Sequence, residues 1–227
     1  MPEHRTSDFI DRTIKISEDG SHTIYSNEFK EHYHSIHGAI AESMHVFIDN
    51  GLHAVKKNPV NVLEIGFGTG LNAFLTLIGS IKNNKSVYYE TIELFPLGQE
   101  IINTINYTDF FDNEFRKYFY KIHDCMWNEK TSIVPDFQLK KIQGDALRFE
   151  SSQMFDLVFF DAFSPESQPE MWTKQIFEKL YLSMYKGGIL TTYCAKGIVK
   201  RTLKEIGFSV EILPGPPGKR HIIKAVK

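Results

Sequence analysis

The sequence has few of the features that mark secreted, membrane-spanning or strongly basic proteins. Its two cysteines, Cys125 and Cys194, are too few and too far apart for a disulfide framework, so we expect free thiols and a cytoplasmic location. No apolar run approaches the roughly 20 residues that a membrane span needs, and residues 1–8 contain no apolar core of a signal sequence. The formal net charge of -2 excludes a surface that is basic throughout, so any contact with nucleic acid must come from a local patch.

Internal repeats and low-complexity tracts are also absent, which excludes a repeat architecture. A chain of 227 residues suits one sizeable core with an appendage and is short for two full domains. We therefore predict an N-terminal extension over residues 1–58, which forms part of a substrate pocket. A single domain follows over residues 59–227, with an insertion at about 107–136 that is crowded with aromatic residues.

The spacing G-x-G-x-x-G of dinucleotide-binding proteins is missing, because its third glycine would fall at Leu71. Instead, an apolar strand over residues 60–65 runs directly into three glycines: Gly66, Gly68 and Gly70. Glycines allow positive φ and close approach of the backbone to a ligand, and the helix that follows presents unpaired N–H groups there. Glu64 precedes this turn and fits a ligand with an ammonium group and no pyrophosphate. S-adenosylmethionine is a cofactor of that kind.

Strands alternate with helices along the chain, which predicts a parallel sheet wrapped by helices. Predicted strands cover residues 60–65, 87–93, 137–143, 156–161, 189–194, 208–213 and 221–227. Predicted helices cover residues 35–57, 71–80, 97–106, 170–185 and 198–206, and short strands lie near 14–16 and 23–25. The link over residues 214–220 is too short for a crossover helix, so the last two strands form an antiparallel hairpin. This pattern predicts an α/β, Rossmann-like class I methyltransferase fold with a seven-stranded, mostly parallel sheet.

Acidic residues follow successive strands at their carboxyl ends, where open α/β sheets bind ligands. Glu93 lies about 20 residues beyond the glycine turn, where a carboxylate accepts hydrogen bonds from ribose hydroxyls. Asp145 follows the third strand and suits the exocyclic amine of adenine, although Gly-Asp pairs are also common in ordinary turns. Asp161 ends the apolar fourth strand, at the position where this kind of fold places its catalytic residues. The alternative is that Asp161 only caps the turn into the next helix.

Two motifs in this region resemble a known family. Residues 161–165, Asp-Ala-Phe-Ser-Pro, and residues 169–173, Pro-Glu-Met-Trp-Thr, resemble the signature of the methyltransferase domain of MnmC, a bacterial enzyme of tRNA wobble-uridine modification. Further similar stretches are residues 25–27, 38–43, 64–70, 93–97, 195–201 and 218–220, so the resemblance covers nearly the whole chain. The Met-Trp block is specific, whereas the glycine turn alone is not.

The resemblance implies transfer of a methyl group from S-adenosylmethionine to the primary amine of 5-aminomethyluridine, often its 2-thio form, at position 34 in the anticodon loop of tRNA. Fused members of the family carry a flavin-dependent oxidase domain that produces this amine, and the present chain has no length left for one. Upstream modification enzymes must then supply the amine, either from a carboxymethylated precursor or directly.

An alkylamine has a pKa of about 10.4, so only about one molecule in a thousand is nucleophilic near pH 7. A carboxylate beside it favours the ammonium form, so Asp161 would hold an N–H and aim the lone pair first, and accept a proton second. We expect Phe163 to wall the uracil ring. Tyr25, Ser26 and Tyr33 are candidates to close the pocket.

Five basic residues form the predicted tRNA-binding patch: Lys196, Lys200, Arg201, Lys219 and Arg220. Phosphate contacts from such a patch would depend strongly on salt, and a solvated helix face is the alternative for Lys200. The aromatic insertion offers either a stacking surface for nucleobases or, more commonly, packing against the sheet edge.

Histidines are dense near the N-terminus: His32, His34, His37, His45 and His53. No cysteine or carboxylate pattern joins them at zinc spacing, so we predict no metal site. Whether His34 or His37 lies near the substrate is left open by the sequence. Two other functions remain alternatives to tRNA methylation. One is methyl or aminopropyl transfer to a small amine on the same fold, and the other is a non-catalytic RNA-binding module. Methyl transfer to tRNA bearing the amine separates all three.

Overall fold

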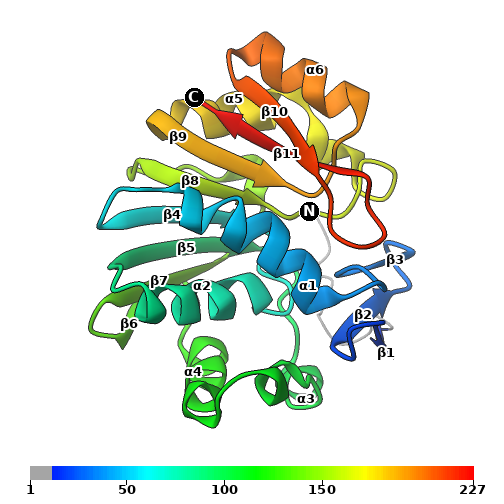
Figure 1. Ribbon diagram of the computed structural model, residues 1–227, viewed down its shortest axis with the longest axis vertical. Coiled ribbons are helices and arrows are strands. Elements are labelled where there is room, and N and C mark those ends of the chain that lie inside the picture. Colours follow the sequence, from blue (N-terminus) through cyan, green and yellow to red (C-terminus); the bar gives the residue numbers. More distant parts are fainter. Residues whose placement is uncertain (1–11) are drawn as a thin grey trace, which may run out of the picture.

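The computed structural model describes residues 12–227. Residues 1–11, which include the start of the predicted extension and the stretch examined for a signal sequence, lie outside the described part. The centre of the structure is one sheet of eight strands (Figure 1). Its strands are β4 (Val60–Ile65), β5 (Val87–Glu93), β6 (Lys130–Val134), β7 (Phe137–Gln143), β8 (Phe155–Phe160), β9 (Met184–Thr192), β10 (Ser209–Pro214) and β11 (His221–Val226).

The strand order is β10-β11-β9-β8-β4-β5-β7-β6. Strands β4, β5, β7, β8 and β9 run parallel to one another. β11 lies between β9 and β10 and is antiparallel to both, as the short link over residues 214–220 predicted. This is the class I methyltransferase arrangement, so the predicted fold class is confirmed.

The predicted count of seven strands is one short. The extra strand, β6, comes from the aromatic insertion and pairs antiparallel with β7 at the edge of the sheet. Its sequence, Lys-Thr-Ser-Ile-Val, buries only Ile133, because an edge strand has one neighbour and one covered face. The segment therefore lacks the apolar run that revealed the other strands.

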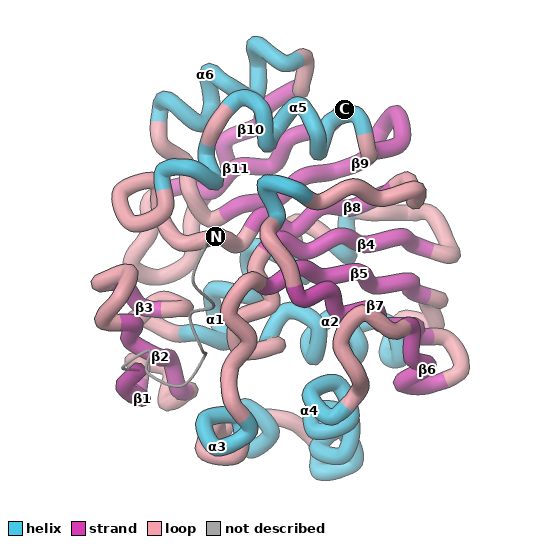
Figure 2. Tube along the Cα trace, turned by 180° about the vertical axis from the view of Figure 1, so that it is seen from behind, coloured by secondary structure: helices cyan, strands magenta, loops and turns pink. Residues whose placement is uncertain are grey.

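Helices cover both faces of the sheet. On one face α1 (Ala39–Ser43), α2 (Leu71–Lys82) and α4 (Asn113–Asp124) join one apolar cluster, and on the other α5 (Lys174–Leu182) and α6 (Gly197–Ile206) join a second one (Figures 1 and 2). The short helix α3 (Gln99–Ile102) lies beside α4. All six residues of β8 are buried, because helices cover the central strand on both sides.

Three predicted helices differ clearly in their bounds. The helix predicted over residues 97–106 is only the short α3, Gln99–Ile102. The helix predicted over residues 35–57 breaks into α1, a π-helical turn at Met44–Asp49 and a 3₁₀ turn at Leu52–Ala54. The break falls at Gly51, where an added Cβ would lie 2.3 Å from the Phe47 carbonyl oxygen and 2.8 Å from the Phe159 ring. The helix predicted over residues 170–185 is divided into a 3₁₀ turn at Pro169–Trp172 and α5 at Lys174–Leu182, and α5 ends there because the chain enters β9 at Met184.

The aromatic insertion packs inward. Tyr107, Phe115 and Phe119 are buried, and the Phe119 ring lies 5.3 Å from Phe74 of α2 in an edge-on contact. Phe110 is an exception and stays 43% exposed. Packing against the core, the commoner alternative for this segment, is therefore confirmed for these buried rings.

The extension forms a small antiparallel sheet of β1 (Arg12–Ile16), β2 (His22–Ser26) and β3 (Glu31–His32). It lies beside the end of the large sheet near the β10–β11 loop (Figure 1). Glu31 fastens it there, since its carboxylate accepts the backbone N–H and the hydroxyl of Ser164 at 3.0 and 2.8 Å. Within residues 12–227, no helix combines the length and the apolar character of a membrane span.

Candidate functional site

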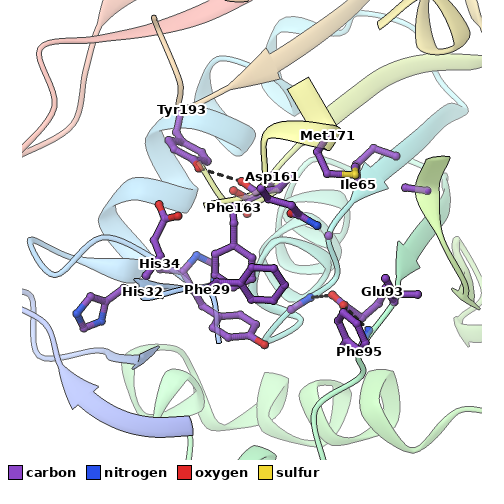
Figure 3. A pocket seen from close by; sticks show the side chains of 18 of the residues that line it. Phe29, His32, His34, Ile65, Glu93, Phe95, Asp161, Phe163, Met171 and Tyr193 are labelled. Carbon is purple, nitrogen blue, oxygen red and sulfur yellow. Dashed lines mark hydrogen bonds between the residues drawn. The ribbon is translucent and has the colours of Figure 1, made fainter. Parts of the chain in front are cut away.

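A cavity of about 470 Å³ opens at the carboxyl ends of β4, β5, β7 and β8 (Figure 3). The predicted residues Gly66, Gly68, Glu93, Asp145 and Asp161 all line it. Residues 29–37 of the extension and residues 218–219 of the β10–β11 loop complete its wall. The volume falls in the range of small-molecule sites, so the cavity is large enough for a nucleoside cofactor.

The glycine turn brings backbone to the cavity wall. Gly66 has φ +91°, and a Cβ there would lie 2.6 Å from the carbonyl oxygen of Asp161. Gly68 has φ +48° and faces the ring of Tyr33, at 3.1 Å from an added Cβ. Gly70, with φ +71°, begins α2 but does not line the cavity. Only glycine fits Gly66, because both the backbone conformation and the space exclude a side chain.

Glu93 is held by the backbone on both sides. Its two carboxylate oxygens accept the N–H groups of Gly68 and Phe95, each at 2.9 Å. Each oxygen keeps a second lone pair, so the carboxylate can still accept hydrogen bonds from a vicinal diol such as a ribose. Asp145 is fixed in the same way, because its Oδ1 accepts the N–H of Leu147 at 2.9 Å.

Asp161 lies half-buried directly after β8 and accepts a hydrogen bond from the Asn72 side-chain amide at 2.8 Å. Burial, with a further contribution from the negative charge of Glu42, raises its pKa to about 7. Asp161 caps no helix, since α5 begins after Thr173 and the turn before it after Gln168, so the capping alternative is wrong. The carboxyl group therefore changes its protonation near neutral pH while facing the cavity.

Glu64 lies below the cavity and not on its wall. It is fully buried, and its Oε2 accepts a hydrogen bond from the Thr91 hydroxyl at 2.7 Å. Burial raises its pKa to about 8, and the charge of nearby Asp161 adds to this increase. The placement does not support a direct contact between Glu64 and an ammonium group of the ligand.

We expect Glu64→Gln to stabilise the protein more at pH 8 than at pH 5. The unfolded chain ionises Glu64 near its ordinary pKa of 4.5, whereas the folded chain holds it neutral up to about pH 8, so wild-type stability falls as pH rises through this window. Glutamine removes that loss, which amounts to about 3 kcal/mol over three pH units. Urea unfolding at both pH values measures it, with Glu100→Gln on the surface as control. An equal effect at both pH values would contradict the buried, neutral state.

Aromatic rings cover the cavity beside Asp161. Phe163 stacks on Phe29 with a centroid distance of 4.4 Å and an angle of 18°, and Tyr33 meets Phe163 edge-on at 5.0 Å. The Phe163 carbonyl accepts the indole N–H of Trp172 at 2.7 Å, so the Met-Trp block fixes this loop. Sequence reasoning missed Phe29, because an isolated aromatic residue in a polar extension carries no periodic signal.

Tyr25 and Ser26 do not line the cavity. The Tyr25 ring packs against His32, 5.0 Å between centroids, and the Ser26 hydroxyl accepts the N–H of Phe29 at 3.3 Å. These residues shape the segment that carries Phe29 and Tyr33. Tyr25 and Ser26 can therefore affect the pocket only through this segment and not as part of the cavity wall.

The predicted basic patch divides into two groups. Lys196 is ion-paired with Glu166, and Lys219 turns into the cavity, where it is ion-paired with Glu42. The remaining three, Lys200, Arg201 and Arg220, lie at the surface, with Lys200 half-buried. The sequence could not separate these groups, because both consist of basic residues at the ends of neighbouring strands.

The N-terminal histidines are dispersed. His34 is buried against the cavity with its Nε2 2.7 Å from the Thr69 hydroxyl, and burial lowers its pKa to about 4, so it is neutral. His37 contacts Glu18 at 2.9 Å, His45 contacts the Pro214 carbonyl at 2.8 Å, and His53 lies 3.3 Å from Asp49. Within residues 12–227, no cluster of histidine, cysteine and carboxylate side chains has the composition of a metal site.

A family model described as S-adenosyl-L-methionine-dependent methyltransferase matches residues 108–227, more than half of the chain. The chain belongs to this family. The methyltransferase is 30% identical over 209 residues to the tRNA 5-methylaminomethyl-2-thiouridine biosynthesis bifunctional protein MnmC of Campylobacter hominis, with coverage of 89% of this chain and 31% of the relative. The protein of the same name from Leptospira interrogans is 29% identical over 223 residues, with coverage of 88% and 33%. The chain therefore spans about a third of the length of the curated relatives it matches.

Among solved structures, the methyltransferase is similar to MnmC2 from Aquifex aeolicus, with a TM-score of 0.81 and 24% identity. The match covers 96% of this chain and 71% of that one, and it shows a shared fold. The resemblance to the methyltransferase domain of MnmC, predicted from the motifs, is thus confirmed. The predicted cofactor, S-adenosylmethionine, is confirmed by the family as well.

The cavity fits this cofactor on its own geometry. Gly66 forms a cradle that a Cβ would fill, and Glu93 and Asp145 are acceptors already oriented by backbone N–H groups. These acceptors suit the hydroxyls of a ribose and the amine of adenine, both of which donate. The cavity therefore matches the donor groups of an adenosine on its β5–β7 side.

Proposed function

We propose that this methyltransferase methylates the primary amine of 5-aminomethyluridine, or of its 2-thio form, at the wobble position 34 of tRNA. The observation that carries the proposal is the Asp161 carboxyl group, which lies at the end of the central strand, beside the glycine turn and under a roof of aromatic rings. Similarity to the MnmC proteins of Campylobacter hominis and Leptospira interrogans supports the substrate.

In this proposal, Glu93, Asp145 and the glycine turn hold the cofactor, which supplies an electrophilic methyl group. Asp161 holds one N–H of the substrate amine and so directs the nitrogen lone pair, and it accepts the proton that the amine loses. Its raised pKa of about 7 suits this role, because a base near neutrality can both take up and release a proton. Phe163, which has Phe29 stacked on one face, walls the uracil ring, and Tyr33 excludes water from the edge of that ring.

The extension, residues 12–58 in the described part, belongs functionally to the same pocket in this proposal. Phe29 and Tyr33 come from it, and Glu31 ties it to the loop that follows Asp161. The domain over residues 59–227 supplies the cofactor site and the carboxylate. In this proposal, upstream modification enzymes produce the aminomethyl group. A tRNA substrate would put the reaction in the cytoplasm, where the two free cysteines, Cys125 and Cys194, stay reduced.

The anticodon loop is best assigned to the surface beside the β10–β11 loop. Lys200 and Arg201 on α6 and Arg220 after β10 are positively charged and at least partly exposed, so we assign them to this surface. Lys196 and Lys219 contribute less, because each has a carboxylate partner. The two MnmC relatives reported above favour neither small-amine transfer nor RNA binding without catalysis.

The deciding experiment combines purified protein with radiolabelled S-adenosylmethionine and two tRNA preparations. One carries 5-aminomethyluridine at position 34, and the matched control carries unmodified uridine there. We expect label to enter only the first preparation and to be recovered as 5-methylaminomethyluridine after digestion. Labelling of free polyamines but not of tRNA would select the small-amine function, and binding of tRNA without any methyl transfer would select the RNA-binding module.

Reversing two charges on α6 should weaken tRNA binding in a salt-dependent way. We expect Lys200→Glu with Arg201→Glu to raise the KM for tRNA by about tenfold at low salt, and to reduce the slope of log KM against log salt by about 1 to 2. The affinity for S-adenosylhomocysteine should not change. Arg116→Glu with Lys117→Glu on α4, another adjacent basic pair in which both residues are exposed, is the matched control. Equal losses in both double variants would remove α6 from the tRNA surface.

A further inference from the structure

Two lysines, Lys30 and Lys219, line the cavity, and they differ in environment. Lys30 is exposed at the rim, whereas the Lys219 side chain is 28% exposed and ion-paired with Glu42, which is 6% exposed. The partners lie 177 residues apart, on the β10–β11 loop and on α1. Figure 1 shows this loop reaching down toward the small sheet and the start of α1. A partly buried ion pair on the wall of a ligand cavity is costly to desolvate and calls for a functional explanation.

The pair is rigidly supported on both sides. The ammonium group of Lys219 lies 4.2 Å from the centre of the Tyr193 ring, and the Tyr193 hydroxyl donates to the Ala162 carbonyl at 2.9 Å. Glu42 accepts the backbone N–H of Ser35 through its other oxygen, at 2.8 Å. Glu42 uses one of the three N–H groups of Lys219, and its carboxylate has lone pairs left. Both groups can therefore bind a ligand without breaking their mutual contact.

The pair lies at the end of the cavity opposite the nucleoside acceptors. Glu93 ends β5 and Asp145 follows β7. On the other side of the glycine turn after β4, Asp161 follows β8 and Tyr193 follows β9. Figure 3 shows the same division, with Glu93 and Phe95 on one side and Tyr193 and His34 on the other. A ligand with its nucleoside against Glu93 thus directs its far end toward Lys219.

The far end of S-adenosylmethionine is an α-amino acid, which carries one ammonium and one carboxylate group. We infer that Lys219 and Glu42 form the subsite for this end, with Lys219 binding the carboxylate and Glu42 the ammonium group. The inference rests on the cofactor orientation given under the proposed function. Lys219 then pairs with Glu42 and with the carboxylate of the ligand, and Glu42 pairs with Lys219 and with the ammonium group of the ligand. No charge is left unpaired in the cavity.

This subsite also selects between related donors. A decarboxylated cofactor, the donor in aminopropyl transfer, would leave one face of Lys219 without its anion in a partly buried cavity, and such a mismatch is discriminated strongly. His34 does not compete for the carboxylate, because burial lowers its pKa to about 4 and keeps it neutral. Lys219 therefore recognises a small anion inside the cavity, in place of the RNA phosphate predicted from the sequence.

Isothermal titration calorimetry with two ligands tests the assignment. S-adenosylhomocysteine keeps the amino-acid end, and 5′-methylthioadenosine lacks it. We expect Lys219→Met to weaken the first by about 10- to 100-fold and to change the second by less than about twofold. Glu42→Gln should act in the same direction, Lys219→Arg should restore part of the affinity, and Lys204→Met on the exposed surface of α6 is the matched control.

Equal weakening of both ligands in Lys219→Met would overturn the inference in favour of a structural role, and so would unchanged affinity for both. The wild-type protein gives a second measurement that needs no variant, since it should bind S-adenosylhomocysteine at least about tenfold more tightly than the decarboxylated analogue. A preference for the decarboxylated form would also overturn the inference. None of these titrations contains tRNA, so their outcome is independent of the methylation assay that tests the proposed function.

Discussion

Replacing Asp161 by asparagine is expected to lower the turnover number for tRNA methylation by about a thousandfold, within the range of lost acid–base and orienting catalysis. Asparagine keeps the volume of the side chain and an oxygen that can accept the Asn72 amide hydrogen bond, so the loop should keep its shape. What it loses is the negative charge and the ability to accept the proton of the amine. Single-turnover kinetics with saturating cofactor measure the effect.

The control for this variant is cofactor binding. The dissociation constant of S-adenosylhomocysteine should change by less than about threefold, since the nucleoside contacts lie on Glu93 and Asp145. A loss of binding as large as the loss of turnover would show that Asp161 serves the cofactor and not the reaction.

The same residue predicts the pH dependence of the wild type. Its pKa is raised to about 7, so the carboxylate forms as pH rises through 7, and kcat should increase over that interval. Below pH 7 the Asp161 carboxyl group is protonated and donates a hydrogen bond, whereas the proposed role requires it to accept one from an N–H of the amine. The profile of Asp161→Asn should lack this rise, and an identical profile in both proteins would assign the rise to another group.

Gly66→Ala should weaken S-adenosylhomocysteine binding by at least about thirtyfold and lower the free energy of unfolding by about 2–4 kcal/mol. The reason is steric, because the new Cβ would lie 2.6 Å from the Asp161 carbonyl oxygen on a residue with φ +91°. Relief of this contact moves two strand ends apart, and both line the cavity. Titration calorimetry and urea unfolding measure the two effects.

Gly98→Ala is the matched control for this substitution. Gly98 has φ -68°, and nothing lies within 4 Å of an added Cβ. Binding and stability should stay within about twofold and about 0.5 kcal/mol of the wild type. If Gly66→Ala behaves like this control, the glycine turn is not the cofactor cradle.

Several elements of the fold could be predicted from the sequence because their signals are local. β4 and β5 have the predicted bounds, and α6 ends at Ile206 with Gly207 as its C-cap, whose φ of +117° suits glycine. The acidic residues at the strand ends converge because parallel strands present their carboxyl ends at one edge. Glu93 and Asp161 therefore meet at the cavity without any knowledge of side-chain packing.

Other elements depended on neighbours that the sequence does not reveal. β6 forms because β7 offers it an unpaired edge, and the helix predicted over residues 35–57 breaks where Gly51 contacts β8. Glu64 has the spacing of a ligand contact, yet its position beneath the turn buries it and raises its pKa to about 8. Spacing alone could not distinguish these environments.

By itself the sequence determined the α/β class, the reversed last strand, the glycine turn and the cofactor. The tertiary structure alone decided that Phe29 roofs the cavity, and that Lys219 turns inward to Glu42 while Arg201 stays outside. Strand direction and positive φ follow from a few neighbouring residues and the limits of the backbone. A pair separated by 177 residues forms only where packing of the whole chain brings the β10–β11 loop and α1 together, and that packing sets the burial of each group.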